Sequence, residues 1–182
     1  MKEITQRESK LKLRMFHLNL YSISAIQHGI QAYHAGMEWL LKYGFDDDLR
    51  NWLENEKTVI VLNGGTSNDE GKDYYFKQEY WGTLQVHREF LMQKGIKFTE
   101  FHEPDINNTL TSIGFLLDER IWDRTNYPNL TFEDACIQLS GQQIDSENEL
   151  SEKEFIRLAM IDKYGEYVVE MREWINKFDL AR

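Results

Sequence analysis

The sequence has few of the residues that staple or interrupt a chain. It contains one cysteine, Cys136, and two prolines among 182 residues. A single cysteine cannot form an internal disulfide, which excludes a disulfide-stapled scaffold. The polar first 14 residues do not resemble a secretory signal, so we expect a cytoplasmic protein. No apolar run approaches the roughly 18 residues of a membrane-spanning helix, and we expect no membrane association.

Positive charge is also scarce. The chain carries 21 basic and 31 acidic side chains, a formal net charge of −10. Affinity for a phosphate backbone normally comes from clustered Lys and Arg, so this balance disfavours tight nucleic-acid binding. The only basic cluster is Lys10, Lys12 and Arg14, which is either a solvated segment or a ligand contact.

The sequence does contain enough material for a packed core. Hydrophobic residues make up 41% and aromatic residues 13% of a chain whose length suits one domain. Patterns predict strands over 14–21, 58–62, 97–102 and 111–117, and helices over 22–43, 46–56 and 74–94. This order predicts an α/β fold, a three-layer sandwich with a small mixed four-stranded sheet.

Three finer expectations follow from the same patterns. The continuous apolar run 58–62 is typical of a buried central strand. In the first helix, Ile26, Ile30, Tyr33, Met37 and Leu41 recur at helical spacing and are expected to face the core. In the helix over 74–94, the side chains expected on the inner side are Trp81, Leu84, Phe90 and Leu91.

The character of the chain changes after residue 124. We expect an α/β domain over 1–124, then a polar linker and an amphipathic C-terminal helix over 125–182. A capping box at Ser151 predicts one long helix over 151–178. Its apolar stripe is expected to pack on the domain or, alternatively, on a partner such as a second subunit.

One polar stripe stands out on the first predicted helix. Gln27, Gln31, His34 and Glu38 follow at spacings of four, three and four, which places them on one helical face. Amides and a histidine are less usual on a solvated stripe than Lys and Glu, so the pattern indicates a site. A solvated stripe with a hydrogen-bonded His34 is the alternative.

Two acids and a glycine pair lie where strands end. Glu103 and Asp105 follow the third strand, and loops at such ends bind ligands in open α/β sheets. These acids could act as a general base or accept ligand hydrogen bonds, whereas Asp105 and Asn107 could instead only close a turn. Gly64 and Gly65 follow the second strand and could wrap a phosphate with backbone amides.

The histidines show no metal-ligand spacing, so we expect neither a metal nor a cofactor.

These residues together resemble a known family. The run 31–35 (QAYHA), directly after the first strand, resembles the Q-x-x-H-A signature of type 2 peptidyl-tRNA hydrolases. Glu103-Pro104-Asp105, followed by 110–113 (LTSI), resembles the loop and last strand of that family. The resemblance covers residues 14 to 118. It implies metal-independent hydrolysis of the ester between a peptide and tRNA, usually by a homodimer.

The resemblance also implies roles. Gln31 and His34 would line the site from the helix, Glu103 or Asp105 would be the acid opposite, and Thr111 the hydroxyl beside it. With the patterns above, the candidate catalytic set is Gln27, Gln31, His34, Asp105 and Thr111. The candidate ligand-binding set is Glu38, Gly64, Gly65, Glu103 and Asn107.

One position departs from the family. Gln27 stands where the family has a lysine, one helical turn before the signature glutamine. A neutral amide replaces a cation there, and loss of one stabilising donor typically costs about 10²–10³ in rate. The sequence therefore supports two hypotheses: a weak hydrolase of peptidyl- or aminoacyl-tRNA, or a non-catalytic binder that uses the cleft for a small nucleotide-like ligand or a protein. A viral host-modifying or counter-defence role would be one setting for the second.

Overall fold

The computed structural model describes residues 11–72, 80–141 and 150–181. The chain divides into two compact units, one made of Met1–Leu117 with Phe178–Arg182 and one of Asp118–Lys177. The boundary expected from the sequence lies after residue 124 instead. The structure places the division several residues earlier and returns the last residues to the first unit.

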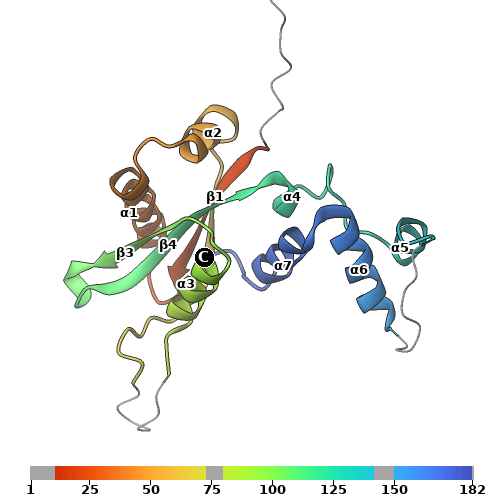
Figure 1. Ribbon diagram of the computed structural model, residues 1–182. Coiled ribbons are helices and arrows are strands. Elements are labelled where there is room, and N and C mark those ends of the chain that lie inside the picture. Colours follow the sequence, from red (N-terminus) through yellow and green to blue (C-terminus); the bar gives the residue numbers. More distant parts are fainter. Residues whose placement is uncertain (1–10, 73–79, 142–149, 182) are drawn as a thin grey trace, which may run out of the picture. The chain divides into compact units, whose positions relative to one another are not determined.

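The first unit is built on a four-stranded sheet with the strand order β2-β1-β4-β3 (Figure 1). Its strands are β1 (Leu13–Leu20), β2 (Val59–Gly65), β3 (Phe98–Glu103) and β4 (Thr109–Asp118). β1 and β2 pair in parallel, whereas β3 and β4 pair antiparallel. Helices cover both faces, which confirms the predicted α/β class with a mixed four-stranded sheet.

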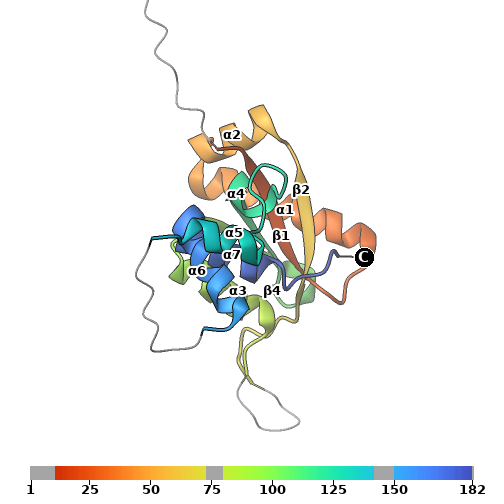
Figure 2. The same cartoon turned by 90° about the vertical axis from the view of Figure 1, so that its right-hand side faces the viewer.

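β2 is an edge strand, so the expectation that it lies at the centre is wrong. The central strands are β1 and β4, and in Figure 2 β1 and β2 run side by side. The outer edge of β2 is partly covered by the C-terminal segment 179–181. The N–H of Asn63 donates to the carbonyl of Asp179 at 2.8 Å, and the N–H of Ala181 donates to that of Val61 at 3.0 Å. This pairing satisfies part of the backbone edge that an edge strand would otherwise leave open.

Two helices, α1 (Ala25–Tyr43) and α2 (Asp47–Asn55), follow β1. α1 begins at a reciprocal capping box between Ser24 and Gln27 and ends at Gly44, whose φ is +68°. α2 begins at Asp46, whose carboxylate accepts the N–H of Leu49 at 2.9 Å and the indole N–H of Trp39 at 3.1 Å.

α1 turns a different face to the sheet than its apolar spacing predicts. The expected inner stripe is exposed: Ile26, Ile30, Tyr33, Met37 and Leu41 are all solvent-accessible. The buried face consists of His28, Gln31, Ala32, Ala35 and Trp39. The small side chains Ala32 and Ala35 let the helix approach closely, and the hydroxyl of Thr99 on β3 donates to the carbonyl of Ala35 at 2.6 Å. Of the two buried polar side chains, Gln31 has partners on β3 and β4, described below, so its burial is tolerated.

α3 (Thr83–Gln93) lies between β2 and β3 in the chain. The predicted helix over 74–94 starts too early: residues 80–82 are not helical, and 73–79 lie outside the described residues. Gly82 packs so tightly that an added Cβ would lie 2.3 Å from the N of Asn68. Trp81 is exposed, contrary to expectation, whereas Leu84 and Leu91 are fully buried as predicted.

The second unit contains four helices among the described residues. They are α4 (Glu119–Trp122), α5 (Phe132–Gln138), α6 (Glu152–Tyr164) and α7 (Glu166–Ile175). The single helix predicted over 151–178 is wrong, because Gly165, at a φ of +89°, separates α6 from α7. Ala135, Ala159, Met160 and Val169 belong to the core of this unit.

Arg172 on α7 is 3% exposed, and its guanidinium donates to the carbonyls of Arg120 and Tyr127. Among the described residues of both units, no helix is long and apolar enough to cross a membrane.

Candidate functional site

A row of polar side chains crosses the sheet beneath the first half of α1, and we call it the polar belt. Its members are Asn19 on β1, His28 and Gln31 on α1, Glu103 on β3, and Thr111 and Ser112 on β4. All except Glu103 are at most 5% exposed. Buried polar groups are costly unless each finds a partner, so such a row in a small core points to a selected feature.

Gln31 connects two strands at the β3 end of the belt. Its Nε2 donates to the Glu103 carboxylate at 2.6 Å, and its Oε1 accepts the Thr111 hydroxyl at 2.6 Å. The carboxylate accepts only, so it fixes the amide with its nitrogen towards Glu103. The same arrangement leaves the amide oxygen facing Thr111. Three elements therefore hold one carboxylate in one direction.

A β-bulge aims the two β4 residues at α1. Phe101 pairs with Ser112 and His102 pairs with Leu110, so Thr111 is the extra residue on β4. Bulges typically re-aim a side chain in this way. Thr111 reaches Gln31, and the Ser112 hydroxyl donates to Asn19 Oδ1 at 2.7 Å.

Asn19 continues the belt towards β2. Its Nδ2 donates to the backbone carbonyl of His28 at 2.8 Å, and its backbone lies opposite Asn63 of β2. The belt therefore runs from Glu103 on one edge strand to the neighbourhood of Asn63 on the other.

His34 lies one turn beyond Gln31 on α1 and also faces β3. Its imidazole stacks on the ring of Phe101, with centroids 4.4 Å apart and an interplanar angle of 18°. The ring is half-buried. The structure thus joins three of the predicted site residues, Gln31, Glu103 and Thr111, by hydrogen bonds. The fourth, His34, lies one turn along α1 and contacts β3 through Phe101.

Other predicted residues lie apart from the belt. Gln27 is exposed, and its Oε1 accepts the N–H of Ser24 at 3.0 Å, so its side chain caps α1. Glu38 is half-buried on the next turn of α1 after His34. Asp105 is exposed on the short 3-10 helix η1 (Pro104–Ile106), and Asn107 follows it with a left-handed φ of +57°.

Gly64 and Gly65 contact α3 rather than the belt. An added Cβ at Gly64 would lie 2.5 Å from Leu84 Cδ2, and the hydroxyl of Thr83 donates to the Gly64 carbonyl at 2.8 Å. The amides of the following loop are also bonded within the chain, since the N–H of Thr66 donates to Thr83 Oγ1 at 2.7 Å. The α3 side chains thus occupy the inner side of this loop.

Sequence reasoning missed Asn19, His28 and Ser112. Asn19 had a visible signal, because it is a polar residue within the apolar run of β1. His28 and Ser112 had none, since only the packing of α1 on the sheet buries His28 and only the adjacency of β1 and β4 brings Ser112 to Asn19. Burial lowers the pKa of His28, so its imidazole is neutral at pH 7.

In the described part of the chain, no three His, Cys, Asp or Glu side chains gather in a group that could hold a metal ion. Neither a scan against models of known protein families nor a search of curated proteins finds a match to this chain. The candidate site therefore stands on its geometry. That geometry offers a carboxylate aimed by an amide and, on the same strand two residues earlier, Phe101 with the half-buried imidazole of His34 stacked on it. Carboxylates and imidazoles are the groups that general acid–base catalysis uses.

Proposed function

We propose that this chain hydrolyses the ester bond of peptidyl-tRNA or aminoacyl-tRNA, at the β3 end of the polar belt. The observation that carries the proposal is the Gln31 amide, which bridges the Glu103 carboxylate and the Thr111 hydroxyl. Such an array is what water activation next to an ester requires: a base with a fixed direction and neighbouring donors.

In this mechanism Glu103 takes a proton from the attacking water, and the water oxygen bonds to the ester carbonyl carbon. The negative charge on the carbonyl oxygen is stabilised by the N–H of the Gln31 amide that does not donate to Glu103. His34, held against Phe101, passes the proton taken up by Glu103 to the departing ribose oxygen as the ester C–O bond breaks and the carbonyl re-forms. Thr111 does not react; it positions Gln31.

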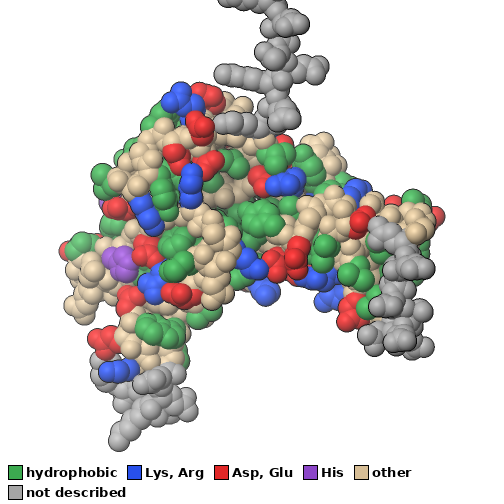
Figure 3. Space-filling model, viewed as in Figure 1, with side chains coloured by type: hydrophobic (Ala, Val, Ile, Leu, Met, Phe, Trp, Pro, Cys, Tyr) green, Lys and Arg blue, Asp and Glu red, His purple; other side chains and the backbone are tan. Residues whose placement is uncertain are grey.

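The scarcity of positively charged side chains predicts a low rate of hydrolysis. Gln27 caps α1 and carries no charge. On the face shown in Figure 3, Lys and Arg side chains lie singly among acidic ones rather than gathered in one area. We therefore expect the activity to be weak. We also propose that it acts in the cytoplasm. We also propose that the chain forms a homodimer, and sedimentation would measure this oligomeric state.

The test is release of the acyl group from N-acetyl-aminoacyl-tRNA and from aminoacyl-tRNA by the full chain. Glu103→Gln should lower kcat by about 10²-fold or more, because it removes the base and keeps the shape. The matched control is Glu100→Gln on the same strand, whose carboxylate instead lies 3.7 Å from Arg88 Nε. Equal rates for the two variants, at equal stability, would reject Glu103 as the base.

Two further variants test the other groups. His34→Phe keeps the ring stack on Phe101 and removes both nitrogens, so the rate should fall while the unfolding midpoint stays. Gln27→Lys should raise the rate by supplying a cation, although it removes the bond that Gln27 Oε1 accepts from Ser24. A Gln27→Lys variant that is folded and no faster contradicts our interpretation of this position.

A second candidate function is binding without catalysis, of a small nucleotide-like ligand or a protein. The net charge of −10 favours it, because it opposes tRNA binding. If the wild-type chain releases no acyl group from either substrate, the hydrolase proposal fails and the binding function replaces it.

A further inference from the structure

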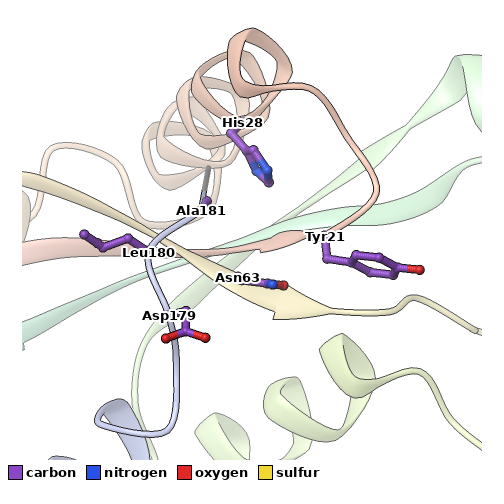
Figure 4. Close-up of a pocket in the computed structure, with 6 residues that line it drawn as sticks. All are labelled: Tyr21, His28, Asn63, Asp179, Leu180 and Ala181. Atoms are coloured by element: carbon purple, nitrogen blue, oxygen red, sulfur yellow. The ribbon is translucent and has the colours of Figure 1, made fainter.

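A separate pocket of about 310 Å³ lies beside edge strand β2, at the other end of the belt from Glu103. It is lined by Tyr21, His28, Asn63, Asp179, Leu180 and Ala181 (Figure 4). Tyr21 directly follows β1, and Asn63 lies near the carboxyl end of β2. Since β1 and β2 are parallel, this is the kind of place where α/β sheets bind ligands.

His28 is the feature that points to a ligand. Its side chain is directed from α1 towards β2 in Figure 4, the residue is 5% exposed, and its Nδ1 has no hydrogen-bond partner. The large majority of buried polar side-chain atoms in proteins are hydrogen-bonded. An unpaired buried nitrogen that lines a pocket therefore indicates a polar group on a molecule bound there.

The other walls restrict the chemistry of that molecule. Among the described residues of the lining, Asp179 carries the only charged side chain, and its carboxylate favours a group with N–H donors over a phosphate. Asn63 Oδ1 already accepts the N–H of Gly65 at 2.9 Å, which leaves the amide nitrogen of Asn63 to donate. The Tyr21 ring is 56% exposed and offers a face for a planar group.

We propose that this pocket binds an unpaired nucleobase that carries an exocyclic amino group. The base stacks on Tyr21, its amino group donates to the Asp179 carboxylate, and a ring nitrogen accepts from Asn63. His28 Nδ1 pairs with a remaining polar edge. Stacking on aromatic side chains combined with hydrogen bonds to base edges is how proteins recognise single-stranded nucleotides.

Asp179 is held in place by backbone pairing rather than by its own side chain. Its carbonyl accepts the N–H of Asn63, and Ala181 donates to Val61 on the same strand. The C-terminal segment thus supplies one wall of the pocket as an added antiparallel strand. A substitution of the Asp179 side chain leaves that pairing intact, which makes it a clean test.

The experiment is calorimetric titration of the full chain with adenosine, cytidine, guanosine and uridine. Uridine lacks an exocyclic amino group and is the matched ligand control. At least one amino-bearing nucleoside should bind about 10-fold or more tightly than uridine. A short single-stranded RNA ending in that base then distinguishes a free nucleoside from an RNA end: a tighter Kd for the oligonucleotide identifies an RNA end as the source.

Substitutions in the pocket lining test which side chains contribute to binding. Tyr21→Ala and Asp179→Asn should each weaken binding by about 10-fold or more. The controls are Tyr80→Ala and Glu54→Gln, which change exposed residues of the same unit outside the pocket and should leave Kd unchanged.

Equal binding of all four nucleosides, no binding of any, or equal effects of the pocket and control variants would each overturn the proposal. Because the readout is binding, failure here is distinguishable from failure of ester hydrolysis at Glu103.

Discussion

Replacing Thr111 by Val removes one hydroxyl from the middle of the polar belt and keeps the branched shape. Thr111 is fully buried, and its hydroxyl donates to Gln31 Oε1 at 2.6 Å. In the variant the Gln31 carbonyl faces a methyl group in a site where it is 5% exposed, so water does not replace the lost donor.

The expected cost is that of an unsatisfied buried acceptor, about 1–3 kcal/mol in the free energy of unfolding. With a urea m-value of roughly 2 kcal/mol per molar, the midpoint should fall by about 0.5–1.5 M. Equilibrium urea unfolding measures this directly. A double-mutant cycle with Gln31→Leu should give a coupling energy of at least about 0.5 kcal/mol, because the two side chains share the bond.

The control is Thr125→Val, the same change at an exposed site, which should stay within about 0.5 kcal/mol of the wild type. A Thr111→Val protein with an unchanged midpoint would refute the reasoning, since Gln31 would then find another partner and nothing would fix its direction towards Glu103.

Three further predictions concern packing, helix stability and pH. Gly64→Ala should destabilise the fold by about 1–3 kcal/mol in thermal or urea unfolding, because its Cβ would lie 2.5 Å from Leu84 Cδ2. Gly29→Ala should stabilise it by about 0.5–1 kcal/mol, since an added Cβ there meets no atom within 4 Å and the site is helical. For His17, burial lowers the pKa from 6.5 to about 4. Below about pH 6.5 the unfolded chain gains a proton that the folded His17 does not, so stability should fall as the pH drops to about 4, by roughly 3 kcal/mol. His17→Leu should remove that part of the pH dependence, and identical pH profiles for the two proteins would contradict it.

The fold class was predictable because alternation and helical spacing are local properties. The strands and the first helices follow from periods in the sequence, and the parallel β1–β2 pair follows from the crossover between them. The place of β2 at an edge was not predictable, because its apolar run reads the same whether another strand or the segment 179–181 covers it. The break at Gly165 was also ambiguous, since apolar spacing continues on both sides of it.

The candidate site was likewise predictable from the sequence only in part. The motif around Gln31 and His34 lies on the helix whose Gln31 side chain meets Glu103 and Thr111 in the structure. The inner face of α1 was assigned wrongly, because hydrophobicity alone favours Ile26 and Leu41 over Gln31. Hydrogen-bond partners on the strands of the sheet decide which face of α1 is buried, and no local sequence pattern contains that information.

The interior of the belt is satisfied by its own bonds, so ligands have access only at its two ends. Asn19, Thr111 and Ser112 are fully buried and hydrogen-bonded, whereas Glu103 is partly exposed and His28 lines a pocket. These ends lie on or beside opposite edge strands of a four-stranded sheet, and three strand spacings amount to roughly 14 Å.

Chemistry at one end and recognition of a base at the other would therefore require a ligand that extends across the sheet. The buried middle residues would then act through position alone. Changing one of them should alter stability and both ends together, whereas a change at Glu103 or Asp179 should alter only its own end.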